Sequence, residues 1–190
     1  PYPWQNYKQV PVHDFLYSGM ENTGTTIFAD SFVIDSIAFN DRNYVNVNAH
    51  ELAHQWFGNL VTETSGTHHW LQEGFATYYA LLAEQDVFGK NYYYMRLYEY
   101  AQELLEQDSR KEGTSLLNPK SSSTTFYKKG AWVLHALREK IGDDAFKTAI
   151  KNYLEIYKFK NVETTHFIHE AEKTSGQNLD AFVAVWLEAE

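Results

Sequence analysis

The segment His50-Glu51-Leu52-Ala53-His54 lies in a run of helical periodicity and determines how the rest of the chain is interpreted. On a helix, residues four apart lie on one face, about 6 Å apart along the axis, so the two imidazoles can converge on one ion. The carboxylate of Glu51 is then beside that ion without being a ligand. From there it can take a proton from a metal-bound water whose pKa zinc has lowered to the neutral range. The segment therefore predicts a catalytic zinc helix.

Two histidines leave a catalytic zinc one protein ligand short, and Glu73 is the candidate for the third. It lies in the segment WLQEGFA at 70–76, at the start of the next predicted helix. Two antiparallel helices joined by a short connection can bring it to the same ion. The alternative, a solvated glutamate beside two buried histidines, is far less favoured once all three spacings are taken together. We therefore predict one Zn²⁺ per chain, bound by His50, His54 and Glu73.

The helical pattern around this segment continues to the end of the chain. Apolar residues recur at three- and four-residue spacings in segments near 43–57, 69–88, 91–108, 125–141, 143–157, 165–174 and 179–188. The first forty residues differ, because short β-branched and aromatic runs, including 25–28 and 32–37, alternate with turn signals. These patterns predict an α+β, predominantly helical fold, with a small mixed sheet in residues 1–40 and a helical lobe in residues 43–190.

Composition excludes several other classes of protein. The chain has 190 residues, is 44% apolar and contains no cysteine, which excludes disorder, disulfide scaffolds and thiol catalysis. Its net charge of −9 is unfavourable for binding a nucleic acid. No apolar stretch reaches the roughly 18–20 residues of a membrane helix. We therefore predict no nucleic-acid partner and no membrane span in this chain, while the compartment stays undecided.

Residues 50–62, HELAHQWFGNLVT, together with WLQEGFA at 70–76, resemble the zinc signature of the aminopeptidase N family of gluzincin metallopeptidases. The resemblance implies a thermolysin-like zincin catalytic domain. It also implies that His50, His54 and Glu73 bind zinc and that Glu51 is the general base. The substrates that it implies are peptides with a free N-terminus.

A second family element, a Gly-Ala-Met-Glu-Asn strand ahead of the zinc helix, is matched here by Ser18-Gly19-Met20-Glu21-Asn22. Taken alone, Glu21 in this turn-rich stretch would be a solvated surface carboxylate. The resemblance implies instead that Glu21 binds the substrate's free amino terminus, as a counter-charge for an ammonium group. It further implies that the strand edge formed by Gly19, Met20 and Asn22 pairs with the peptide backbone.

A third family element, a tyrosine followed by a charged pair and glycine, is matched by Tyr127-Lys128-Lys129-Gly130. Attack on a peptide carbonyl creates an oxyanion, and a phenol hydroxyl opposite the metal can donate a hydrogen bond that strengthens as the charge develops. Tyr127 is one of 14 tyrosines, and only the resemblance distinguishes it from the others. We predict that it is catalytic.

Several positions depart from the family pattern. His68 stands five residues before Glu73, where an aspartate is common and could orient a zinc-bound histidine. Either His68 takes over that task or another residue performs it. Ala80 replaces a frequent glutamate, so one acidic contact in the cleft is expected to be missing. His69 is expected to pack against loop residues rather than to bind a second metal.

The sequence as a whole predicts a single metallopeptidase catalytic domain over residues 1–190. Its predicted activity is zinc-dependent hydrolysis of the N-terminal peptide bond. The resemblance implies that complete relatives add an N-terminal β-domain and a C-terminal helical domain, which this chain lacks, so the missing domains of the same full-length protein are expected partners. Two alternatives stay open: a catalytically weak peptide-binding fragment that retains the zinc site, and an endopeptidase or epoxide hydrolase on the same fold.

Overall fold

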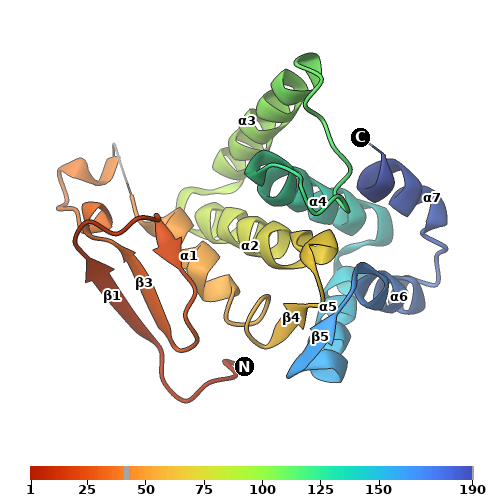
Figure 1. Cartoon of the computed structure of the whole chain (residues 1–190), viewed down its shortest axis with the longest axis horizontal. Coiled ribbons are helices and arrows are strands. Elements are labelled where there is room, and N and C mark those ends of the chain that lie inside the picture. The colour runs from red at the N-terminus through yellow and green to blue at the C-terminus, as the bar shows by residue number, and fades with distance from the viewer. Residues whose placement is uncertain (41–42, 190) are drawn as a thin grey trace.

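The computed structural model describes residues 1–40 and 43–189; residue 190, the last of the predicted helical lobe, lies outside the described part. A small sheet lies at one end of the molecule, and helices make up the rest (Figure 1). The predicted α+β, predominantly helical architecture is therefore confirmed. The two parts meet at helix α1 (Val45–Ala53), which stands between the sheet and helix α2 (Trp70–Phe88) (Figure 1).

The N-terminal sheet is mixed, as predicted. Its strands are β1 (Lys8–Val12), β2 (Gly19–Met20) and β3 (Thr25–Ala29), in the spatial order β1-β3-β2. Strand β1 runs parallel to β3, and β2 runs antiparallel to it. Thr26 and Phe28, two residues apart in β3, both lie on its buried face. Among the described strands β2 pairs only with β3, so its other edge is available for pairing with an extended peptide.

The prediction of a strand at residues 32–37 is wrong. Asp30–Phe32 forms a short 3-10 helix, η1, and no strand follows it in residues 33–37. The Asp35 carboxylate accepts hydrogen bonds from the backbone N–H groups of Ile37 and Ala38, at 2.9 and 3.0 Å. Such a local side-chain cap turns the chain and removes those groups from any ladder. A second short helix, η2 (Ala38–Asn40), follows at once.

The helices agree with the periodic segments to within about two residues, except at the end of the first. Beyond α1 and α2 they are α3 (Lys90–Ser109), the π-helical turn η4 (Thr124–Lys129), α4 (Gly130–Ile141), α5 (Asp143–Tyr157), α6 (Thr164–Ser175), α7 (Asp180–Val183) and the π-helical turn η5 (Ala184–Glu188). Helix α1 ends at Ala53 rather than near 57, because tighter hydrogen bonds, such as Gln55 N–H to Leu52 O at 3.1 Å, replace the helical ones.

Helix α2 is the centre of the core. It packs against α1, α3 and α4, and its side chains Trp70, Phe75 and Tyr78 have no exposed surface. The Phe75 ring stacks on Phe57, with 4.3 Å between centroids, and meets Phe167 of α6 edge-on. A helix held on so many sides is a rigid support for a functional side chain. Among the described residues, no helix has both the length and the apolarity that a membrane crossing requires.

A second, two-stranded sheet was not predicted. Strand β4 (Val61–Glu63) pairs in parallel with β5 (Lys160–Val162), and a 3-10 turn, η3 (Gly66–His68), leads from β4 toward α2. Strands of three residues are too short to produce a readable alternation. Their pairing ties the α1–α2 connection to the α5–α6 connection, and this fixes the backbone close to the start of α2.

Candidate functional site

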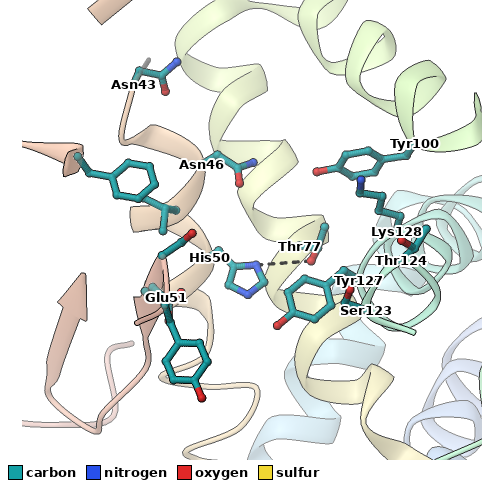
Figure 2. A pocket seen from close by; sticks show the side chains of 15 residues that line it. Asn43, Asn46, His50, Glu51, Thr77, Tyr100, Ser123, Thr124, Tyr127 and Lys128 are labelled. Atoms are coloured by element: carbon teal, nitrogen blue, oxygen red, sulfur yellow. Dashed lines mark hydrogen bonds between the residues drawn. The ribbon is translucent and has the colours of Figure 1, made fainter. Parts of the chain in front are cut away.

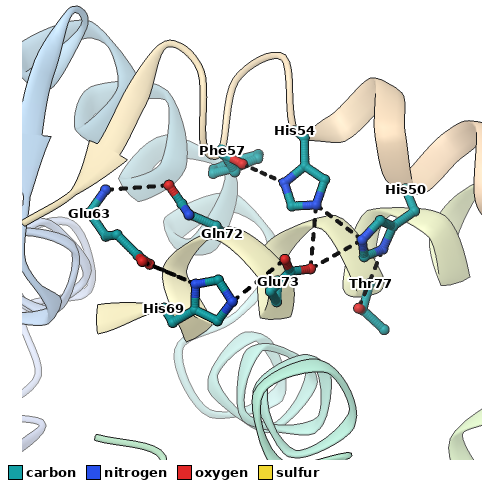
Figure 3. A network of polar contacts seen from close by, with 8 residues as sticks. All are labelled: His50, His54, Phe57, Glu63, His69, Gln72, Glu73 and Thr77. Carbon is teal, nitrogen blue, oxygen red and sulfur yellow. Dashed lines mark hydrogen bonds and ion pairs between the residues drawn. The ribbon is translucent and has the colours of Figure 1, made fainter. Parts of the chain in front are cut away.

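The three predicted metal ligands lie together where α1 faces the first turn of α2 (Figure 3). His50 is in α1, His54 follows directly after it, and Glu73 is in α2. The two histidine Nε2 atoms are 3.0 Å apart, and Glu73 Oε2 lies 3.2 Å from His50 Nε2 and 3.4 Å from His54 Nε2. Their side chains are 12%, 2% and 10% exposed, in the order His50, His54, Glu73. The structure thus brings all three together in a nearly dry site.

This donor set fits a zinc ion. With zinc–ligand bonds of about 2.0–2.1 Å and tetrahedral angles, neighbouring ligand atoms should be about 3.3 Å apart, close to the observed separations. The ring of His54 is oriented because its Nδ1–H donates to the Phe57 carbonyl at 2.9 Å, which leaves Nε2 as the unprotonated nitrogen of the neutral ring. The Thr77 hydroxyl lies 3.5 Å from His50 Nδ1. Nitrogen and carboxylate donors in this arrangement could hold one ion and leave a fourth position open.

Glu51 lies on α1 next to His50 and is buried. Burial raises the pKa of its carboxyl to about 7, against the opposing effect of His54. A β-carbon on Gly19 of strand β2 would come within 2.3 Å of Glu51 Oε1. Strand β2 can therefore lie this close to the carboxylate only because residue 19 has no side chain. A carboxyl with a pKa near neutrality can act as a proton carrier at physiological pH.

Tyr127 lies in η4 on the opposite side of the pocket from β2 (Figure 2). Its ring is parallel to the His50 imidazole, with 5.4 Å between centroids and 7° between planes. Burial, and next the negative charge of Glu73, raises the pKa of the Tyr127 phenol, so its hydroxyl keeps its proton. The backbones of Gly74 in α2 and Gly130, which follows η4, touch, since a β-carbon on Gly130 would lie 2.8 Å from Gly74 Cα. That contact determines how near η4 comes to α2.

Glu21 directly follows β2 and is tied to the end of α1 through its backbone. Its carbonyl accepts hydrogen bonds from Asn59 Nδ2 at 2.7 Å and from Gln55 Nε2 at 3.2 Å. The Gln55 Oε1 atom accepts from the Gly24 N–H at 2.8 Å. Neither Gln55 nor Asn59 is predicted from the sequence to belong to the site. The one available signal was an amide next to His54 that is fully buried, and burial cannot be read from sequence.

The Glu21 side chain points toward the predicted metal ligands. One oxygen each from Glu21 and Glu51 and a nitrogen of His54 all lie within 4.8 Å of one another. The neighbouring Met20 and Asn22 are exposed. The Glu21 carboxylate therefore lies beside His54, directly after strand β2.

These groups surround a pocket of about 560 Å³ (Figure 2). Its walls include Gly19 from β2, His50 and Glu51 from α1, and Tyr127 from η4. Its far end is lined by polar side chains, among them Asn46 of α1. A pocket of this size accommodates one or two amino-acid residues of an extended chain.

Comparison with known proteins identifies the family of the chain. The model of the peptidase family M1 domain matches residues 1–186. The chain belongs to peptidase family M1. It is 31% identical over 198 residues to Aminopeptidase M1-D of Oryza sativa subsp. japonica. The alignment covers 98% of this chain and 23% of the rice protein. The chain thus spans about a quarter of the length of this curated relative.

Solved structures agree with the M1 assignment. A variant of the M1 zinc metallopeptidase of Deinococcus radiodurans, bound to the substrate Tyr-Ser-Ala, superposes with a TM-score of 0.78 at 28% identity, covering 100% of this chain and 41% of that chain. Yeast LTA4 hydrolase in complex with bestatin superposes with a TM-score of 0.82 at 26% identity. The superposition covers 99% of this chain and 32% of the yeast chain. The predicted family, the zincin fold and zinc as the cofactor are confirmed.

The charges of His50, His54 and Glu73 depend on one another. Burial lowers the pKa of His50. Burial acts in the same direction on His54, but the hydrogen bond and charge of Glu73 outweigh it and raise the pKa of His54 to about 9. For Glu73, burial is outweighed by its hydrogen bonds to the two histidines, which hold the pKa of its carboxyl well below the ordinary value. Without a metal, His54 therefore keeps a proton, which an ion bound at this position would have to displace.

The two histidines at the start of α2 behave differently from each other in this M1 chain. His68 Nδ1 accepts a hydrogen bond from the Thr164 N–H at 3.2 Å and lies 3.1 Å from the Thr164 hydroxyl. His68 therefore orients none of the three predicted metal ligands. The Phe57 carbonyl and the Thr77 hydroxyl contact those rings instead. His69, which is expected to pack against loop residues rather than to bind a metal, lies between the carboxylates of Glu63 and Glu73 (Figure 3).

Proposed function

We propose that this M1 chain is the catalytic domain of a zinc-dependent aminopeptidase, which hydrolyses the N-terminal peptide bond of peptides. The observation that carries the proposal is the position of Glu21, whose carboxylate lies within 4.8 Å of donor atoms of Glu51 and His54. A carboxylate beside a metal site and a base is suited to bind the ammonium group of a substrate. The aminopeptidase name of the rice relative and the tripeptide bound by the Deinococcus radiodurans neighbour support the same class of substrate.

His50, His54 and Glu73 would hold the zinc. When bound, zinc supplies a Lewis acid that polarises the scissile carbonyl and makes water more acidic. His54 Nδ1–H bonds to the Phe57 carbonyl, and this fixes the ring with Nε2 toward the metal site. His50 lies in α1, His54 directly follows it and Glu73 lies in α2, which packs against α1, so the geometry of the three is formed before substrate binds.

Glu51 is the proposed general base. It takes a proton from the attacking water and then delivers that proton to the amine that leaves. Both transfers are favourable near neutral pH, because burial raises the pKa of the Glu51 carboxyl to about 7. Gly19 leaves the space for the carboxylate between β2 and α1.

Tyr127 is proposed to stabilise the oxyanion that forms on the carbonyl. Its phenol keeps its proton because burial and the charge of Glu73 raise its pKa. Stacking on the His50 ring fixes the direction in which the hydroxyl points. A donor held in place before the reaction stabilises the developing charge without reorganising.

The substrate would lie along the free edge of β2. Gly19, Met20 and Asn22 would pair with its backbone, as in strand addition, while Glu21 binds its ammonium group. The backbone of Glu21 is tied to Gln55, so the anchor keeps a constant distance from the metal site. This constant distance would place the first peptide bond, rather than a later one, at the zinc. Because the chain spans about a quarter of its curated relative, we also infer that other parts of a full-length protein complete the cleft.

The test is to neutralise Glu21 in the full-length protein and to compare two kinds of substrate. Glu21→Gln should lose roughly 2–4 kcal/mol of transition-state binding for free-amino substrates, as expected when one partner of a buried charge pair is removed. N-acetylated analogues should be poor for the parent protein and nearly unaffected by the change. Glu155→Gln, which removes an exposed charge on α5, is the matched control.

The outcome also separates the alternatives. Equal cleavage of free and blocked peptides by the parent protein would remove the anchor role and favour an endopeptidase. Hydrolysis of an epoxide with no turnover of peptides would favour an epoxide hydrolase. Peptide binding without any turnover, in a zinc-loaded full-length protein, would favour a binding module.

A further inference from the structure

The carboxylate of Glu73 has two oxygens that face different partners (Figure 3). Oε2 faces the metal site, at 3.2 Å from His50 Nε2 and 3.4 Å from His54 Nε2. Oε1 faces the other way, at 3.7 Å from Nε2 of His69. His69 and Glu73 are four residues apart at the start of α2 and therefore share a face of the helix. The Glu73 oxygen that faces away from the metal site is thus next to the His69 imidazole.

His69 is itself held in place. Its Nδ1 lies 3.0 and 3.1 Å from the two oxygens of Glu63. The ring also meets the Phe126 ring edge-on, with 5.0 Å between centroids. An imidazole fixed on two sides has little freedom to turn away from Glu73.

The backbone of Glu63 is fixed by the small sheet that the sequence did not predict. Glu63 is the last residue of β4, and its carbonyl accepts a hydrogen bond from Asn161 Nδ2 at 3.3 Å. The next residue, Thr64, donates its N–H to the Val162 carbonyl at 3.0 Å. The chain from Glu63 through His69 to Glu73 therefore leads from a paired strand to the metal site.

We propose that Glu63 and His69 are positioning residues that hold the Glu73 carboxylate with a single oxygen toward the metal and thereby raise the affinity for zinc. The proposal rests on the zinc site proposed above. A carboxylate ligand that is free to rotate can offer both oxygens or neither, whereas a contact at its rear limits it to one. Limiting Glu73 to one oxygen also preserves an open position on the metal, which a catalytic zinc requires.

The neighbouring His68 provides a matched control within the same turn. It has the same side chain and is one residue away, but its hydrogen bonds go to Thr164. A general effect of removing an imidazole from this turn would appear in both variants. An effect through Glu73 would appear only at His69.

The test measures the zinc dissociation constant of the purified protein by competition with a chelator of known affinity. His69→Leu should raise this constant by roughly 10- to 100-fold, the usual effect of losing a group that orients a metal ligand. Glu63→Gln should raise it less, and adding Glu63→Gln to His69→Leu should change it little further, because the two residues act as a unit. His69→Gln, which keeps a donor group, should recover part of the loss. His68→Leu should stay within about twofold of the parent.

The controls separate the possible failures. His54→Ala tests the zinc site itself: if it binds zinc as tightly as the parent, the proposed site is wrong. If His54→Ala loses zinc while His69→Leu keeps the parent's dissociation constant, only the positioning role is wrong. An equal loss in His68→Leu and His69→Leu would also overturn the proposal. If His69→Leu does not fold by circular dichroism, the comparison of Glu63→Gln with His68→Leu decides, and parental affinity in Glu63→Gln overturns the proposal.

Discussion

Replacing Gly130 with alanine would test how closely the turn that carries Tyr127 must approach α2. A β-carbon at residue 130 would lie 2.8 Å from Gly74 Cα and 3.8 Å from Trp70 Cβ. The nearer obstacle is backbone, and α2 cannot easily yield because Trp70 is completely buried in the core. We therefore expect η4 and α4 to move away from α2 in Gly130→Ala.

The sign of the stability change distinguishes this explanation from simple helix propensity. In an unhindered helix, replacing glycine with alanine stabilises by up to about 1 kcal/mol. Here ordinary contact begins at 3.4 Å, so the backbones must separate by roughly 0.6 Å, and overpacking of this kind costs about 1–3 kcal/mol. The net expectation is a loss of about 1–2 kcal/mol, or a fall of roughly 2–8 °C in Tm for a chain of this length.

The same displacement should reduce activity. Tyr127 lies three residues before Gly130, and a shift of about 1 Å in a positioned group can lower the rate about 100-fold, so we expect kcat to fall roughly tenfold or more. Thermal unfolding and kcat would be measured on Gly130→Ala and on the reciprocal Gly74→Ala, with zinc content checked in both. An unchanged or higher Tm together with the parental kcat would refute the reasoning.

Tyr127→Phe should lower kcat by roughly 10²–10³ with a much smaller change in KM, and an unchanged kcat would leave Tyr127 as a packing partner of His50. In the metal-free protein the pKa of His54 is raised from 6.5 to about 9, so its contribution to stability is complete below pH 6.5 and is lost as the pH rises through about 9. Urea unfolding should show a loss on the order of 3 kcal/mol over that range without zinc, and a flat profile would contradict the assigned charge.

The long helices could be predicted from sequence because their apolar spacing repeats over several turns. The short elements could not. The run at 32–37 has the composition of a strand, but the Asp35 side chain caps the backbone and forms a turn. Strands β4 and β5 have three residues each and are formed by pairing between segments almost a hundred residues apart.

The meeting of the proposed metal ligands was predictable to the extent that its geometry is local. The i,i+4 spacing of His50 and His54 places both on one helix face, whatever surrounds the helix. Local spacing does not determine which residue contacts the second carboxylate oxygen of Glu73, because that depends on how the turn at η3 rotates the start of α2. That rotation sends His68 to Thr164 and His69 to Glu73, although the two histidines are adjacent in the sequence. The amide contacts of Gln55 likewise depend on where the sheet packs against α1.

The central claim is that Glu51 moves the proton while His50, His54 and Glu73 hold the zinc. The most direct test is to measure zinc content and aminoacyl-anilide turnover on the same sample of full-length Glu51→Gln. We expect about one zinc per chain, as in the parent, with kcat lowered by roughly 10²–10⁴, because the substitution removes the base and leaves the ligands in place. Turnover at the parental rate in a zinc-loaded Glu51→Gln protein would contradict it.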